Sequence, residues 1–199
     1  MILYLHGFRS SPRSFKARVV QERMTAAGRA GELICPQLPA SPKAAMELAL
    51  LLAGRHAPDN LAIVGSSLGG FYATWLAERL GVPAVLLNPA VDPLKDLEKH
   101  VGVTTAWHSS EPFEFRREYI DELAELKVDR ITRPERYFLL AATGDEVLDY
   151  RDMVAHYAGA RQHVIQGSDH AISAFPQYVD EVLAFCQPQV DWATAGKAQ

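Results

Sequence analysis

The chain alternates short, continuous apolar runs with stretches of helical periodicity. Continuous apolar runs are typical of strands that are covered on both faces, whereas an alternating pattern marks a strand with one face in water. The apolar runs cover residues 2–6, 33–35, 61–64, 84–87, 137–142 and 163–165. Helical patterns occupy residues 14–27, 42–56, 68–80, 151–157 and 174–185. This order predicts a mostly parallel, doubly wound α/β sheet of about six strands with helices on both faces.

Residues that favour helix ends support these assignments. Gly28 and Gly81 stand where the first and third helices should end, and glycine is the usual residue just beyond a helix C-terminus. Pro42 follows Ser41, which suits the first turn of a helix because proline has no N–H to leave unpaired there.

One segment interrupts the regular alternation. Residues 90–134 are richer in charge and carry several aromatic side chains, with a helical pattern at 118–128 and no obvious strand. Long irregular insertions in compact domains are often lids over ligand sites, so we expect a small cap, with an idle surface excursion as the alternative. We expect a single domain over residues 1–187 and a frayed tail over 188–199.

Composition and charge exclude some classes of function. The chain has 199 residues, 48% of them hydrophobic and 22% charged, with a formal net charge of −4. A nucleic-acid-binding protein usually has a basic excess or a basic stripe, and this sequence has neither. No apolar window approaches the length of a membrane span, and no pattern of a secretory signal is visible. Cys35 and Cys186 are far apart and read as ordinary buried thiols, so we expect a cytoplasmic protein.

The clearest chemical signal is a G-x-S-x-G motif, Gly65-Ser66-Ser67-Leu68-Gly69, between an apolar run and a helical pattern. In a sharp turn from strand to helix, the serine hydroxyl is pushed clear of the sheet edge and becomes accessible to a base and a substrate. The glycines avoid collisions within that turn. A phosphate-binding loop would need Gly-Lys-Ser/Thr at its end, and Phe71 stands there instead. The motif therefore predicts Ser67 as a nucleophile.

An acid and a base follow in the order that this type of hydrolase uses, which is nucleophile, acid, histidine. Asp145 ends the 137–142 run in a Thr-Gly-Asp turn, with Asp149 and Asp92 as rival acids. His170 follows the last predicted strand and precedes the last helix, so we predict it as the base. The remaining histidines fit structural roles, except that His108 in the cap could contact substrate.

The N-terminal strand runs into His6-Gly7-Phe8, the place where this fold takes one amide of its oxyanion hole. We predict that the backbone N–H groups of Phe8 and Leu68 stabilise the developing oxyanion. His6 itself is expected to be structural. A metal site made of His6, Asp145 and His170 has no supporting motif, and we expect neither a metal nor a cofactor.

Together these motifs resemble the small bacterial YqiA-type esterases of the α/β-hydrolase superfamily. The resemblance runs from residue 1 to about 185, although Arg9 stands where a smaller polar residue is usual and residues 98–115 do not align. It is carried by Tyr4-Leu5-His6-Gly7-Phe8-Arg9-Ser10-Ser11-Pro12, Cys35-Pro36-Gln37-Leu38-Pro39, Val64-Gly65-Ser66-Ser67-Leu68-Gly69-Gly70-Phe71-Tyr72-Ala73 and Thr143-Gly144-Asp145-Glu146-Val147-Leu148-Asp149-Tyr150. It implies a minimal α/β-hydrolase that acts on acyl esters or thioesters without cofactors, with a triad of Ser67, Asp145 and His170.

The sequence therefore predicts a serine esterase with a small-molecule acyl substrate and an acyl-enzyme intermediate. A thioesterase or another acyl hydrolase of the same fold, or a catalytically inactive binding protein, remain the alternatives. The aromatic residues of the cap either line an acyl pocket or pack the cap onto the body: Trp107, Phe113, Phe115 and Tyr119. The sequence does not indicate the oligomeric state.

Overall fold

The fold is organised around a parallel six-stranded sheet, in a computed structural model that describes residues 1–105 and 112–187. The strand order is β2-β1-β3-β4-β7-β8, and every neighbouring pair is parallel. The strands are β1 (Ile2–Leu5), β2 (Leu33–Ile34), β3 (Ala62–Ser66), β4 (Ala84–Leu87), β7 (Tyr137–Ala142) and β8 (Arg161–Ile165). The predicted sheet of about six strands is confirmed.

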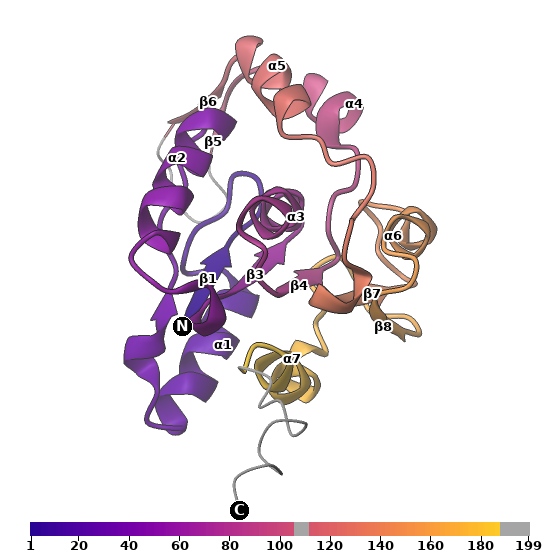
Figure 1. The fold of residues 1–199 in the computed structure, drawn as a ribbon. Coiled ribbons are helices and arrows are strands. Elements are labelled where there is room, and N and C mark those ends of the chain that lie inside the picture. The colour runs from indigo at the N-terminus through magenta and orange to yellow at the C-terminus, as the bar shows by residue number, and fades with distance from the viewer. Residues whose placement is uncertain (106–111, 188–199) are drawn as a thin grey trace, which may run out of the picture.

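Helices cover both faces of this sheet, as predicted (Figure 1). The helices α1 (Phe15–Ala26) and α7 (Val179–Phe185) pack on one face. Three helices pack on the other: α2 (Pro42–Ala53), α3 (Leu68–Leu80) and α6 (Tyr150–His156). Alternate residues of each strand enter the two cores, so that Leu3 and Leu5 face α3 while Ile2 and Tyr4 face α1. Burial on both faces explains why these strands read as continuous apolar runs.

The residues predicted at the ends of α1 and α3 and at the start of α2 take those positions in the structure. Gly28 and Gly81 both adopt the left-handed conformation at the end of a helix, with φ of 71° and 72°. Ser41 caps α2 through its hydroxyl, which accepts a hydrogen bond of 3.1 Å from the N–H of Ala44. The last predicted helix is shorter than expected: a 3-10 turn, Phe175–Gln177, comes first and α7 begins only at Val179.

The expectation that residues 90–134 hold no strand was wrong. After α4 (Pro93–Glu98), the strands β5 (Gly102–Thr105) and β6 (Pro112–Phe115) pair in an antiparallel hairpin, and α5 (Glu118–Glu125) follows. Four-residue strands with glycine or proline at one end carry little periodicity, so the sequence pattern did not reveal them. In Figure 1 these elements lie together beyond the α2 and α3 side of the sheet.

Aromatic packing joins the hairpin to the N-terminal loop. The Phe8 ring contacts Phe113 and Phe115 edge-on, at centroid distances of 5.3 and 5.1 Å, and Phe115 in turn contacts Tyr119 at 5.5 Å. The Arg9 guanidinium adds a hydrogen bond of 2.7 Å to the carbonyl of Thr105. These three aromatic residues of the segment therefore pack it onto the body, which was one of the two alternatives.

Helix α5 is fixed at the start of α2. The Glu122 carboxylate accepts hydrogen bonds from the Ser41 hydroxyl, at 2.7 Å, and from the N–H of Lys43, at 2.9 Å.

Within residues 1–105 and 112–187, no helix combines the length and the apolar character that crossing a bilayer requires. The predicted tail, 188–199, lies outside the described residues.

Removing the Phe115 ring should detach the hairpin from the body. Because this side chain is 1% exposed, we expect Phe115→Ala to lower the free energy of unfolding by about 3–5 kcal/mol, as measured by urea denaturation. Val103→Ala is the matched control on the neighbouring strand: Val103 is 74% exposed, so its loss should change stability by less than about 0.5 kcal/mol. Equal effects of the two substitutions would contradict the packing described here.

Candidate active site

The direction in which the chain adds successive strands to the sheet reverses between β1 and β3. The chain winds from β1 outward to β2 and then from β3 outward to β8, so β1 and β3 form the switch point at which open α/β sheets bind ligands. Gly7 follows β1 and Ser67 follows β3 at their carboxyl ends. A side chain on Gly7 would meet Ser67, with its Cβ 3.2 Å from the Ser67 Cβ and 3.6 Å from Oγ.

Ser67 occupies the sharp turn that the motif predicts. Its φ of 56° and ψ of −123° are strained for a residue with a side chain. Neighbouring backbone holds this conformation: the N–H of Ser67 donates to the carbonyl of Leu87, and the Ser67 carbonyl accepts from Gly70 and Ala90, all at 2.8–3.1 Å. The serine hydroxyl is thereby presented at the edge of the sheet.

Two glycines allow the turn. A Cβ on Gly65 would overlap the carbonyl of Gly69, and a Cβ on Gly69 would overlap the carbonyl of Leu5 at the end of β1. Helix α3 therefore starts in direct contact with both central strands, a spacing that only glycine permits.

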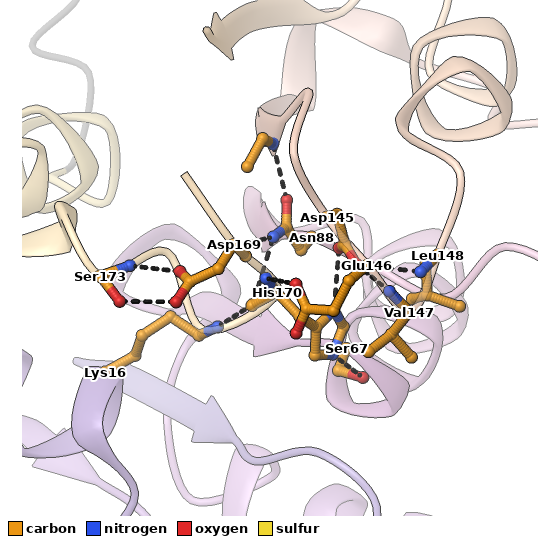
Figure 2. A network of polar contacts seen from close by, with 11 residues as sticks. Lys16, Ser67, Asn88, Asp145, Glu146, Val147, Leu148, Asp169, His170 and Ser173 are labelled. Atoms are coloured by element: carbon orange, nitrogen blue, oxygen red, sulfur yellow. Dashed lines mark hydrogen bonds and ion pairs between the residues drawn. The ribbon is translucent and has the colours of Figure 1, made fainter. Parts of the chain in front are cut away.

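The structure brings Ser67, Asp145 and His170 together in one line of hydrogen bonds (Figure 2). The distance from Ser67 Oγ to His170 Nε2 is 3.0 Å, and the distance from His170 Nδ1 to Asp145 Oδ2 is 2.8 Å. Because an ionised carboxylate can only accept, the imidazole proton lies on Nδ1 and Nε2 is left to accept from the serine hydroxyl. This is the protonation state that a general base needs.

The Asp145 carboxylate is held away from water. Its side chain is 0% exposed, compared with 21% for the His170 side chain. Its second oxygen, Oδ1, accepts hydrogen bonds from the N–H groups of Val147 and Leu148 at 2.8 and 2.9 Å. Fixed donors of this kind leave the carboxylate one orientation, with Oδ2 directed at the imidazole.

The rival acids have other partners. Asp149 caps α6 by accepting from the N–H of Arg151 at 2.9 Å and pairs with the Arg151 guanidinium, which lowers the Asp149 pKa below its ordinary value. Asp92 accepts from Lys127 at 3.0 Å. Neither is among the partners that the structure gives His170.

His6 holds the loop that leads to Phe8. Its Nε2 accepts from the N–H of Leu38 at 3.0 Å, so the ring proton lies on Nδ1, which donates to the carbonyl of Gly7 at 3.0 Å. The N–H of Ser10 donates to the same carbonyl at 3.2 Å. Since a trans peptide directs its C=O and its N–H in opposite directions, the N–H of Phe8 is turned away from these partners.

Phe8 and Leu68 border the same cavity as Ser67. Leu68 is the first residue of α3, and the first N–H groups of a helix have no partner within the helix. The two amides predicted for the oxyanion hole thus belong to segments that meet at Ser67.

The cavity beside Ser67 and His170 has a volume of about 460 Å³, which is typical of sites for small molecules. Its walls come largely from the loop after β1, from the start of α1, from α4 and from the loop after β7. Apolar side chains in these walls include Phe15, Leu97, Val147 and Leu148. The sequence pattern does not indicate them, because single apolar residues in a loop, at the first position of a helix or in a six-residue helix carry no periodic signal. Phe113, Phe115 and Tyr119 are not among the lining residues, and Trp107 and His108 lie outside the described residues.

In the part of the chain that the structure describes, no three His, Cys, Asp or Glu side chains are grouped as a metal site would need. His6 and His170 are each engaged as described above, one on the Gly7 carbonyl and one on Asp145.

Comparison with known proteins places the chain in one family and one fold. Residues 1–187 match the sequence model of UPF0227, described as an uncharacterised protein family. A protein from Agrobacterium vitis S4 that is assigned to the hydrolases superposes with a TM-score of 0.72 at 20% identity, over 94% of this chain and 87% of that one. The α/β-hydrolase domain-containing protein 10 from mouse gives 0.66 at 19% identity, over 92% and 89%. Est1E from Butyrivibrio proteoclasticus, with ferulic acid bound, gives 0.65 at 16% identity, over 93% and 88%.

Enlarging Gly69 should disturb both stability and the site. Gly69→Ala forces α3 away from the end of β1, so we expect the free energy of unfolding to fall by about 3 kcal/mol or more, and the Phe8 and Leu68 amides to separate. Gly31→Ala is the control, because a Cβ on Gly31 meets nothing within 4 Å. Urea denaturation of both variants tests this, and a Gly69→Ala protein as stable as Gly31→Ala would refute the close contact.

Proposed function

Since the chain belongs to the uncharacterised protein family UPF0227 and has the α/β-hydrolase fold, we propose that it is a serine hydrolase that cleaves carboxylic esters or thioesters through an acyl-enzyme on Ser67. The observation that carries the proposal is the line of hydrogen bonds from Ser67 through His170 to Asp145, with distances of 3.0 and 2.8 Å. It supports a nucleophile, a general base and an acid in the roles predicted from the sequence.

In the first half-reaction, Ser67 Oγ attacks the substrate carbonyl carbon while its proton passes to His170 Nε2. Asp145 stabilises the resulting imidazolium through Nδ1–H, and the carbonyl oxygen becomes an oxyanion that accepts from the N–H groups of Phe8 and Leu68. When the intermediate collapses, the bond to the leaving group breaks and that group takes the proton from Nε2. The acyl part of the substrate stays bound to Ser67 Oγ as an ester.

In the second half-reaction, water repeats these steps. His170 takes a proton from the water molecule, the hydroxide oxygen attacks the acyl carbon, and the tetrahedral intermediate expels Ser67 Oγ, which recovers its proton. The products are a carboxylic acid and an alcohol or a thiol. No cofactor takes part in this scheme.

The apolar walls favour an acyl group of low polarity. With the reacting carbonyl beside Ser67, the acyl chain lies against side chains of α4 and of the loop after β7, such as Leu97 and Leu148. An ester and a thioester place the same acyl group in this cavity and differ only in the leaving atom, so the proposal covers both. We expect the reaction to occur in the cytoplasm, in keeping with the two free thiols, Cys35 and Cys186.

Ser67→Ala should remove hydrolysis while leaving the fold intact. We expect kcat for a short-chain nitrophenyl ester and for a short-chain acyl thioester to fall by at least about 10⁴-fold, with an unchanged urea midpoint. A fluorophosphonate probe should label the natural protein, and mass spectrometry should place the adduct on Ser67. The neighbouring Ser66 is an internal control: labelling there, or turnover retained without Ser67, would refute the proposal.

Asp145→Asn should reduce kcat by about 10⁴-fold with little effect on folding. The amide oxygen still accepts from Val147 and Leu148, but the amide NH₂ then faces Nδ1 and favours the tautomer with its proton on Nε2, which cannot accept from Ser67. Asp149→Asn is the control in the same loop, and its effect on kcat should stay within a few-fold. The reverse outcome in steady-state kinetics would assign the acid to Asp149.

A further inference from the structure

Lys16 is a buried lysine in the wall of the cavity that contains Ser67 and His170. It is the second residue of α1, it is 7% exposed, and it borders that cavity. Its ammonium donates a hydrogen bond of 3.0 Å to the carbonyl of His170. The bond joins the start of the chain to the loop that carries the proposed base.

The local environment opposes a charged lysine at this position. The N-terminal end of a helix carries partial positive charge, so a cation in the first turn is disfavoured, and α1 has no acidic residue there to offset it. Burial lowers the pKa of Lys16 from 10.5 to about 8, although Asp145, Asp169 and Glu146 act in the opposite direction. Since neither helix stability nor core packing favours this residue, its contact with the histidine loop is the feature that accounts for it.

The backbone of His170 is held on both sides by side chains (Figure 2). Its N–H donates to the Glu146 carboxylate at 2.9 Å, and its carbonyl accepts from Asn88 at 3.2 Å as well as from Lys16. Asn88 is 0% exposed, and its amide oxygen accepts from the N–H of Ala142 at the end of β7. The histidine is thus tied to three separate elements, and Lys16 is the link to α1.

The same loop region concentrates negative charge. Asp145 and Glu146 come from the loop after β7 and Asp169 from the loop after β8, and all three act on Lys16 electrostatically. Hydrogen bonds from Ser173 lower the Asp169 pKa below its ordinary value, so this carboxylate stays charged. A positive charge placed among these carboxylates reduces their mutual repulsion and keeps the loops together.

We infer that Lys16 is a positioning residue for His170: its ammonium fixes the carbonyl of the histidine and balances the surrounding carboxylates, so that the imidazole stays in line between Ser67 and Asp145. This inference rests on the proposed function. Lys16 acts through the histidine loop and takes no part in the transfer of the acyl group.

The inference predicts a specific pH dependence. The groups facing the Lys16 ammonium are Asp145, Glu146 and Asp169, together with the His170 carbonyl. With its pKa near 8, the ammonium loses its proton as the pH rises through this value, and its charge no longer balances the carboxylates. We therefore expect kcat/KM of the natural protein to fall on the alkaline side with a midpoint near pH 8. Lys16→Arg keeps its charge to much higher pH, so this midpoint should move upward.

Lys16→Met should lower kcat by about 10²-fold with little change in KM, because the base is misplaced while the acyl cavity stays, and the alkaline decline should disappear. Lys43→Met is the matched control: Lys43 is also the second residue of a helix, α2, and its side chain is exposed. It should keep the activity and the pH profile of the natural protein. Urea denaturation checks the folding of each variant.

The outcomes separate the two proposals. If the natural protein hydrolyses esters and is labelled on Ser67, but Lys16→Met matches it in kcat and pH profile, then the role of Lys16 is refuted and the proposed function stands. If Lys16→Met does not fold, Lys16→Arg decides, since an alkaline midpoint equal to that of the natural protein also refutes the role. A natural protein that neither hydrolyses esters nor reacts with the fluorophosphonate refutes both.

Discussion

The structure depends on how closely the first turn of α3 approaches the ends of β1 and β3. Gly69 lies against the Leu5 carbonyl and Gly65 against the Gly69 carbonyl, without space for a single methyl group at either position. This contact fixes the strained conformation of Ser67, directs the first amides of α3 at the cavity and brings the β1 loop beside the serine side chain. A wider spacing would relax the Ser67 turn, turn the first amides of α3 away from the cavity and move the β1 loop away from the serine. The close packing of α3 on the sheet therefore also sets the geometry of the site.

A parallel sheet then collects the remaining groups. All six strands run in one direction, so the loops that follow β1, β3, β4, β7 and β8 reach the same edge. Each loop brings one group of the proposed site to this edge: the Phe8 amide, the Ser67 hydroxyl, the Asn88 amide, the Asp145 carboxylate and the His170 imidazole. Because the loops are short and their side chains bond to one another's backbone, each one limits the positions available to the next. The site is preorganised by the strands rather than by any one loop.

Much of the fold and of the candidate site could be predicted from the sequence, for physical reasons. Strands buried on both faces leave continuous apolar runs, and the sharp turn at Ser67 requires glycines at fixed spacing, so the sheet and the position of the Ser67 turn have strong local signals. The choice of Asp145 over Asp149 and Asp92 rested on its position at the end of a strand. The β5–β6 hairpin and the cavity walls were missed because their residues carry little periodic pattern and are brought together by contacts between distant parts of the chain. Phe8, for example, packs against a hairpin more than 90 residues away, and no local pattern records such a pair.

The buried polar network explains a feature that neither periodicity nor motifs would indicate. Burying an ammonium or an amide is unfavourable unless its hydrogen-bonding partners are present, and for Lys16 and Asn88 they are. Here the partners are backbone groups at the end of β7 and in the loop that carries His170, and the carbonyl of His170 receives two of the donors. These hydrogen bonds hold the His170 loop against the end of β4 and the start of α1. The distance of 3.0 Å between His170 Nε2 and Ser67 Oγ depends on the position of this loop, so a base proposed at His170 needs restraint of the loop backbone as well as apolar burial.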